Sequence, residues 1–286
     1  MNICVAGQGE LAETLVYLAE RAGNNAVLLP MEVEGAPLAV AHSDLLLLAS
    51  APEQLRPLVR ALRPGPGSVV VVAIRGLDPE TGRRLSEIVP LESGCLRVGA
   101  LGGPLLPAEL LRGSPGAGVV ASAFEEVNQR TVKALHSPLF RVYPSRDLAD
   151  VELAGALVLV LATALGVARG MGLGVGTQAV LVTRGIAEGA RLARRTGGDP
   201  STFSGLAGVG ELVAASSIPD HPGLSRGQAL AAGGEDLPLA ALCDALLERE
   251  RDLPITAGIR QLARRKISAA QLLHGLTERQ GRAESA

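Results

Sequence analysis

The segment Gly7-Gln8-Gly9-Glu10-Leu11-Ala12 is the feature that most restricts the fold of this chain. It follows a short apolar run, Ile3 to Ala6, and precedes an amphipathic pattern that continues to about Ala22. A strand, a Gly-x-Gly-x-x-Ala turn and a helix in this order are typical of a dinucleotide-binding unit. Gly7 allows a tight turn, and Gly9 lets a pyrophosphate approach the backbone at the positive end of the helix. We therefore predict that Gly7, Gly9 and Ala12 bind a cofactor.

Short apolar runs alternate with helical patterns through the first half of the chain. This alternation predicts an α/β fold with a Rossmann-like, doubly wound parallel sheet. The stretch Val142 to Asp147 is the predicted boundary, which gives a dinucleotide-binding domain over 1–146 and an all-helical substrate and dimerisation domain over 147–286. Asp147 or Asp150 can cap the helix that follows. The further predicted strands are Ala26 to Leu29, Leu45 to Ala49, Val69 to Ile74, Leu96 to Gly99 and Gly118 to Ser122.

The second half is predicted to be helical throughout. Its most apolar segment, Leu153 to Ala168, is short, is interrupted by glycine and is followed by Arg169, so we expect a buried core helix and no membrane span. The predicted helices are Val151 to Arg169, Thr177 to Thr196, Leu206 to Ser216, Gly227 to Ala231, Leu237 to Leu247, Ile255 to Arg264 and Ala269 to Gln280.

Composition excludes several classes of function. The 286 residues are 47% hydrophobic, which is enough for two cores. A net charge of -2 and 2% aromatic residues argue against nucleic-acid binding. Three widely spaced cysteines argue against a disulfide framework and a zinc site, and no other metal cluster is visible. The N-terminus has no basic region before its apolar residues, so we expect no signal peptide and a cytoplasmic location.

The turn also carries features that affect the cofactor. Glu10 places a carboxylate where a phosphate would lie, unless its side chain turns to solvent. Glu32 is positioned after the second strand to meet a ribose hydroxyl, although a solvated loop residue is an equal interpretation. No arginine follows that strand, which favours NAD over NADP.

Three motifs in the second half point to a known family. They are D-L-A-D-V-E-L-A-G-A-L-V-L from Asp147, G-L-G-V-G-T-Q-A-V-L-V-T-R-G from Gly172 and T-F-S-G-L-A-G-V-G-E-L from Thr202. In this order they resemble the substrate domain of NAD-dependent glycerol-3-phosphate dehydrogenases. The resemblance implies an oxidoreductase that transfers hydride between a nicotinamide cofactor and a small phosphorylated or otherwise anionic ketone or alcohol. We also expect a homodimer.

The resemblance fails at the position that carries the chemistry. Val158 and Leu159 stand where the family has its catalytic lysine and an asparagine. A lysine there would stabilise charge on the reacting oxygen and deliver a proton, and valine can do neither. The chain has two lysines in all, Lys133 and Lys266, and both fall outside the family motifs. The family also has a longer segment between the second and third strands.

Other residues are candidates for the missing roles. Arg75 matches a second family lysine and offers positive charge, although it is a poor proton donor and could be a surface arginine. Glu211 stands where relatives have aspartate. His221 could perform acid-base work or be an incidental loop residue. Ser225 and Arg226 resemble the family's phosphate clamp.

Three hypotheses follow. The first is a dehydrogenase with impaired or altered activity. The second is a non-catalytic paralogue that serves as a ligand-binding or partner subunit, and the third is a purely structural dimer.

Overall fold

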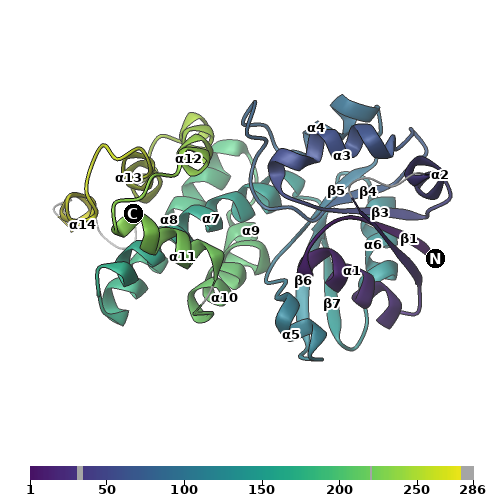
Figure 1. Ribbon diagram of the computed structural model, residues 1–286, viewed down its shortest axis with the longest axis horizontal. Helices are drawn as coiled ribbons and strands as arrows, with labels where there is room; N and C mark the ends of the chain where they lie inside the picture. The colour runs from purple at the N-terminus through teal and green to yellow at the C-terminus, as the bar shows by residue number, and fades with distance from the viewer. Residues whose placement is uncertain (31–34, 220, 278–286) are drawn as a thin grey trace.

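The fold of the first half is a seven-stranded sheet covered on both faces by helices (Figure 1). The computed structural model describes residues 1–30, 35–219 and 221–277. The strand order is β2-β1-β3-β4-β5-β6-β7, and every neighbouring pair is parallel except β5 and β6. The strands are β1 (Asn2–Gly7), β2 (Asn25–Leu29), β3 (Leu45–Ala49), β4 (Val70–Val72), β5 (Val98–Gly102), β6 (Gly116–Ala121) and β7 (Phe140–Ser145).

The predicted Rossmann-like sheet is confirmed, with two differences. The antiparallel step between β5 and β6 was not expected. Strand β7 was not among the predicted strands, because its buried side chains, Phe140 and Val142, alternate with exposed Arg141 and Tyr143 in a short, polar segment. This edge strand is stabilised by pairing with β6 over its whole length. The predicted division at 146/147 falls between β7 and the next helix.

Two layers of helices bury the faces of the sheet. On one face lie α1 (Glu10–Arg21), α5 (Pro107–Leu111) and α6 (Glu125–Leu135), and on the other lie α2 (Ala36–Ala41), α3 (Leu55–Leu62) and α4 (Leu85–Ser93) (Figure 1). Successive strand residues point to opposite faces, so β1 contributes Ile3 and Val5 to one core and Cys4 and Ala6 to the other.

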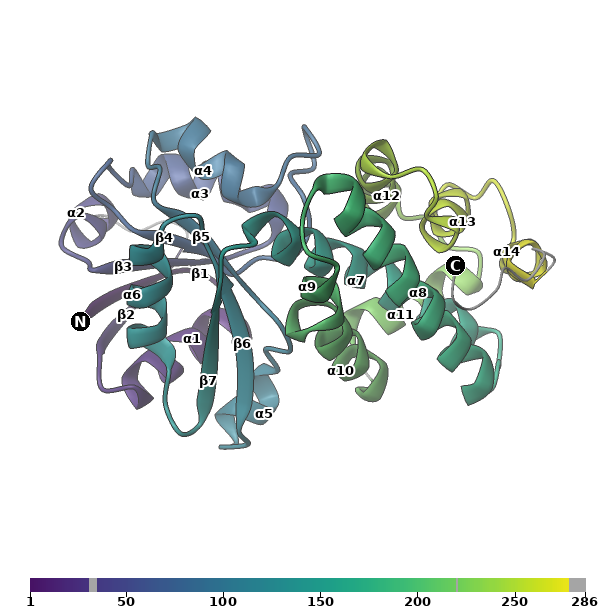
Figure 2. The ribbon, with the colours of Figure 1, turned by 180° about the vertical axis from the view of Figure 1, so that it is seen from behind.

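The second half is a helical assembly built around α7 (Leu148–Gly170), as Figure 2 shows from behind. Asp147 caps this helix by accepting from the Asp150 amide at 3.3 Å, whereas Asp150 itself is buried and accepts from Thr196. Around α7 lie α8 (Val175–Thr196), α9 (Pro200–Ser204), a π-helical turn (Leu206–Gly210), α10 (Glu211–Ser217), α11 (Pro222–Ala231), α12 (Leu237–Arg249), α13 (Pro254–Ala263) and α14 (Ala269–Thr277).

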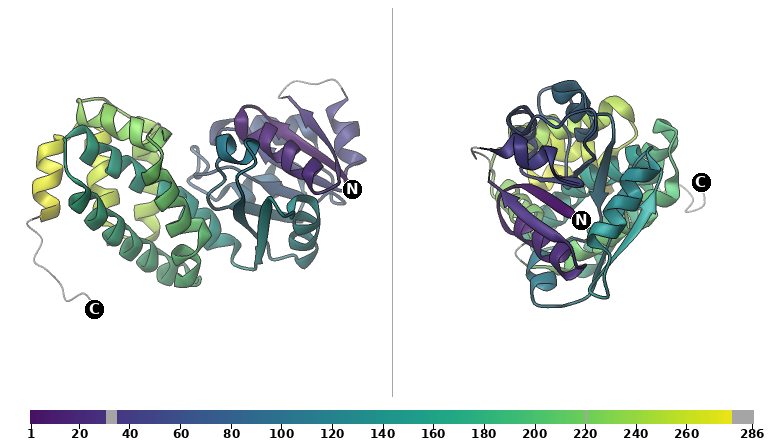
Figure 3. Two further views of the ribbon diagram at one scale, coloured as in Figure 1. Left: turned by 90° about the horizontal axis from the view of Figure 1, so that it is seen from below. Right: turned by 90° about the vertical axis from the view of Figure 1, so that its right-hand side faces the viewer.

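Helix α7 is buried because its neighbours surround it. By length and composition alone it could cross a membrane, but 94% of its most apolar window is buried inside the protein, as in a core helix. Helix α11 approaches it closely at Gly166 and Gly227. A methyl group on Gly166 would lie 2.2 Å from the Leu224 carbonyl oxygen, and one on Gly227 would lie 2.1 Å from that of Thr163. Helix α14 lies at the end of the molecule farthest from the sheet (Figure 3).

Candidate functional site

A cleft of about 740 Å³ lies between the carboxyl edge of the sheet and the helical half. Parallel α/β sheets bind ligands at this edge, where neighbouring strands lead the chain in opposite directions. Here β1 and β3 are those neighbours, with Gly7 paired to Ala49. The residues that line the cleft include Leu11, Pro52, Arg75, Gly76, Val158, Leu159, Glu211, His221, Arg226 and, from α12, Leu239, Leu242 and Glu248.

The cleft contains an ion pair between Arg75 and Glu211. Arg75 follows β4 and donates from Nε to Glu211 Oε1 at 2.6 Å and from Nη2 to the Gly103 carbonyl at 2.5 Å. The two side chains are only 15% and 13% exposed, so Arg75 is not a surface arginine. Burial raises the pKa of the Glu211 carboxyl, and the charge of Arg75 opposes this rise. Oxygen Oε2 of Glu211 is buried without a hydrogen-bond partner among the described residues.

The wall contributed by α7 is hydrocarbon at its centre. Val158, which is 1% exposed, and the half-buried Leu159 both line the cleft. One turn earlier, Gly155 leaves room for Arg75, since a methyl group there would lie 3.3 Å from the Arg75 Cγ. Among the described residues that line the cleft, the only side chains with a permanent positive charge are Arg75 and Arg226.

His221 reaches the cleft but has a structural task. It is the residue before α11, and its Nδ1 accepts a hydrogen bond from the Gly223 amide at 3.1 Å. Burial, assisted by the charge of Arg75, lowers the pKa of the imidazole. The ring is therefore neutral near pH 7, with its hydrogen on Nε2, because Nδ1 acts as the acceptor.

The two candidate phosphate ligands, Ser225 and Arg226, differ in whether they line the cleft. Arg226 lines the cleft, is 43% exposed and has its Nε 2.9 Å from Asp236 Oδ2. Ser225 is exposed and is not one of the described lining residues. Both belong to α11, where adjacent side chains point about 100° apart, so one of them faces the cleft and the other does not.

The turn after β1 fits a dinucleotide. Gly7 has φ +145°, and a methyl group on it would lie 1.7 Å from the Ala49 carbonyl oxygen, so only glycine lets β1 and β3 meet there. Gly9 precedes α1 with φ +85°, and no atom lies within 4 Å of where its Cβ would be. This open space borders the first turn of α1, whose amides lack partners within the helix. Ala12 is buried beneath the turn and Glu10 is exposed, while Glu32 lies outside the described residues.

Known proteins with similar sequences decide the family. A relative from Deinococcus radiodurans, named glycerol-3-phosphate dehydrogenase (NAD(P)+), is 38% identical over 276 residues, which cover 91% of this chain and 82% of that protein. The protein of the same name from Moorella thermoacetica is 42% identical over 179 residues, covering 62% of this chain and 53% of its own length. This chain belongs to the NAD(P)+-dependent glycerol-3-phosphate dehydrogenase family.

The family assignment extends to the helical half and to the fold. The family model for the C-terminus of NAD-dependent glycerol-3-phosphate dehydrogenase matches residues 147–274. Among solved structures, the glycerol-3-phosphate dehydrogenase from Coxiella burnetii superposes with a TM-score of 0.85 at 23% identity, covering 97% of this chain and 99% of that one. A ketopantoate reductase from Ralstonia eutropha superposes with a TM-score of 0.57 at 17% identity, over 96% of this chain and 100% of that one. The resemblance found in the three motifs is thus confirmed.

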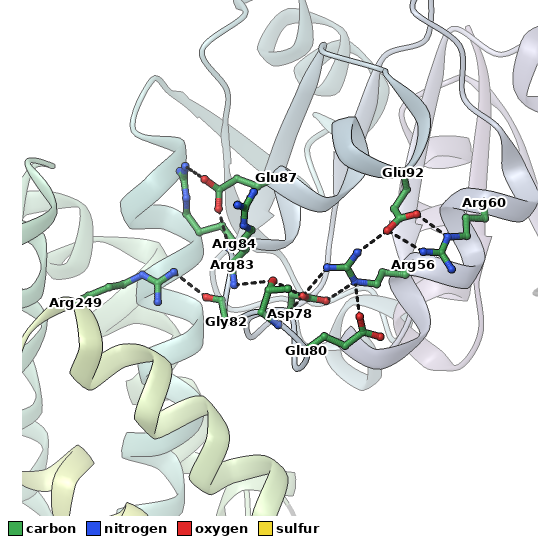
Figure 4. A network of polar contacts seen from close by, with 11 residues as sticks. Arg56, Arg60, Asp78, Glu80, Gly82, Arg83, Arg84, Glu87, Glu92 and Arg249 are labelled. Carbon is green, nitrogen blue, oxygen red and sulfur yellow. Dashed lines mark hydrogen bonds and ion pairs between the residues drawn. The ribbon is translucent and has the colours of Figure 1, made fainter.

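In the present chain, a polar network holds the loop around Asp78, which lies beside the cleft (Figure 4). The motifs did not reveal this network. Asp78 receives two hydrogen bonds from Arg56 of α3, at 3.0 and 2.8 Å, and Arg56 also contacts Glu92 of α4. On the far side of the loop, Arg249 of α12 donates to the Gly82 carbonyl at 2.7 Å. The loop therefore ties the sheet to the helical half. No local pattern marks these residues, because their partners are distant in sequence.

Proposed function

We propose that this protein is an NAD(P)-dependent dehydrogenase that interconverts a small anionic ketone and its alcohol in the cleft. The observation that supports this most strongly is the placement of Arg75, Glu211 and Arg226 around one cleft in a chain of this family. The turn at Gly7 and Gly9 would hold the cofactor, whose nicotinamide supplies or accepts the hydride, and Ala12 would support that turn from beneath. The glycerol 3-phosphate in the names of the relatives makes a phosphorylated triose the first substrate to test.

Arg75 is proposed to stabilise negative charge on the substrate oxygen. Its guanidinium stays charged at every physiological pH, so it cannot be the proton donor. Reduction of a carbonyl consumes one hydride and one proton, and another residue must deliver that proton.

Glu211 is proposed to carry the proton. Its pKa is raised by burial, and Oε2 has no partner within the described residues. His221 is less suited, because its Nδ1 caps α11 and its pKa is lowered. Because the neighbouring arginine favours the ionised carboxylate, Glu211 holds a proton for a smaller fraction of the time than an ammonium group, whose usual pKa is about 10.4. Because positioned proton transfer contributes about 100- to 10,000-fold to a rate, we expect slow turnover.

A second function is supported by one specific observation, the hydrocarbon wall made by Val158 and Leu159. A protein of this kind would bind nucleotide and substrate analogue without turnover, as a ligand-binding or partner subunit. The use of NAD in preference to NADP, a cytoplasmic location and a homodimer remain predictions.

The test combines binding with turnover. We expect the purified protein to bind NADH in a fluorescence titration and to oxidise it slowly with dihydroxyacetone phosphate or another small oxo compound. Binding without any oxidation would favour the second function. The double variant Val158→Lys, Leu159→Asn should raise turnover if the proton donor is the only deficit. If neither NADH nor NADPH binds, the dehydrogenase proposal is wrong.

A further inference from the structure

The positive charge available to a substrate in the cleft is small. Arg75 contacts Glu211 and the Gly103 carbonyl and is assigned to the carbonyl oxygen of the substrate, so it is not available to the anionic group. The remaining cation is Arg226, and its Nε lies beside Asp236. Carboxylates outnumber guanidinium groups among the described lining residues: these are Glu53, Asp78, Glu80, Glu211, Asp244 and Glu248 against Arg75 and Arg226.

Some of these carboxylates are compensated from outside the cleft. Asp78 pairs with Arg56, and Asp244 pairs with Arg260 and Arg264. Even so, the cleft does not have an excess of positive charge. A group with two negative charges would enter against this field, whereas a single charge needs only one cation.

The geometry of Arg226 matches a planar anion. Because its Nε faces Asp236, the two terminal nitrogens are the part of the guanidinium left for a ligand, and the described residues give them no hydrogen-bond partner. Two parallel N–H groups bind the two oxygens of a carboxylate in one plane. A phosphomonoester carries three such oxygens and about -1.5 to -2 charges at neutral pH.

Among the described lining residues, no further cation is left for the third oxygen. Leu159 has only methyl groups, and Gly227 presses against α7 so closely that no side chain fits there. The imidazole of His221 is neutral, since its pKa is lowered and its Nδ1 accepts from the Gly223 amide. The lining near Val158 and Leu159 is instead suited to hydrocarbon.

We propose that the substrate of this cleft is a small 2-oxo acid, or the corresponding hydroxy acid, with an apolar side chain. The carboxylate binds Arg226, and the hydrocarbon contacts Val158 and Leu159. This inference rests on the proposed dehydrogenase function and names its substrate class. In the reducing direction the carbonyl carbon gains the hydride of NAD(P)H, its oxygen gains a proton, and the products are the hydroxy acid and NAD(P)+.

The experiment compares ligand affinities directly, so that it does not depend on turnover. Isothermal titration of the full chain saturated with NAD+ uses 2-oxobutanoate, 2-oxopentanoate and dihydroxyacetone phosphate as probes. We expect the oxo acids to bind at least tenfold more tightly than the phosphate. Each added CH₂ should tighten binding by about three- to fourfold, as expected for burial against hydrocarbon.

Two variants test the assigned contacts. Arg226→Gln should weaken oxo-acid binding about tenfold or more, because it removes a charge-assisted bidentate contact. Arg112→Gln, an exposed arginine that is not among the described lining residues, should leave it unchanged. Leu159→Asn adds a hydrogen-bond donor to the cleft. It should therefore reduce the difference in affinity between the oxo acids and dihydroxyacetone phosphate.

The outcomes separate the two proposals. Tighter binding and reduction of dihydroxyacetone phosphate would overturn the oxo-acid assignment and leave the dehydrogenase proposal standing. Oxo-acid binding that depends on Arg226, without any oxidation of NADH or NADPH, would support the ligand class and refute the dehydrogenase function. The inference would be overturned if the oxo acids did not bind, or if Arg226→Gln left their affinity unchanged.

Discussion

Replacing Glu152 by glutamine should remove a large part of the pH dependence of stability. Glu152 lies in α7 and is 7% exposed, facing the start of α4 in the other half of the protein. Its carboxyl accepts hydrogen bonds from the Ser86 amide at 2.8 Å and the Ser86 hydroxyl at 2.5 Å. Burial raises its pKa from 4.5 to about 7, although both bonds to Ser86 oppose the rise.

The direction of this pH dependence follows from the number of protons that the folded and unfolded states bind. Because the pKa is higher in the folded state, the folded protein binds more protons than the unfolded chain between pH 4.5 and about 7. The contribution of Glu152 to stability is therefore fully present below pH 4.5 and is lost as the pH rises to about 7. At about 1.4 kcal/mol for each tenfold change in proton affinity, the loss from pH 5 to pH 8 is about 2 to 3 kcal/mol.

Urea unfolding followed by circular dichroism at pH 5 and pH 8 measures this loss. Glutamine retains an acceptor for Ser86 and carries no charge, so Glu152→Gln should reduce the drop in unfolding free energy by about 2 to 3 kcal/mol. Glu13→Gln, at an exposed position of α1, should not change it. If the wild-type protein and Glu152→Gln lose the same free energy between the two pH values, burial does not control this carboxyl and the reasoning fails.

Further predictions concern packing, the turn and the ion pair. Gly166→Ala should lower the unfolding free energy by about 3 kcal/mol, because its methyl group would clash with α11, whereas Gly176→Ala, with open space around it, should raise it by about 0.5 to 1 kcal/mol; urea titration compares them. Gly7→Ala should lower the melting temperature sharply, whereas Gly9→Ala should lower the unfolding free energy by about 1 to 3 kcal/mol and weaken NADH binding in a fluorescence titration. Arg75→Met should lower the unfolding free energy by about 3 kcal/mol at pH 8 and by less at pH 5, where the buried carboxylate of Glu211 can take up a proton. An equal loss of unfolding free energy at both pH values would argue against the pairing of Arg75 with Glu211.

Much of the fold was predictable because it depends on local patterns. The apolar runs at Ile3 to Ala6 and Leu45 to Ala49 lie in strands, since a strand buried on both faces is a continuous apolar segment. The run Ala26 to Leu29 also lies in a strand, although Val27 is 46% exposed there. The core helix α7 was predicted for a similar reason. The edge strand β7 was not, because half of its residues are polar and its stability comes from pairing with β6.

The candidate site was predictable only in part. Arg75 and Glu211 could be named from motifs, but the motifs did not reveal that they pair across 136 positions of chain. That His221 caps α11 and that Asp236 holds Arg226 were equally invisible.

The sequence by itself determined most strands and helices along the chain, the glycine turn and the family motifs, because these depend on the residue types and their spacing. Tertiary structure alone decided which charges in the cleft are already paired and which remain for a ligand. The physical reason is that packing brings together side chains far apart in the chain, and their mutual neutralisation depends on distances of a few ångströms that no local pattern encodes.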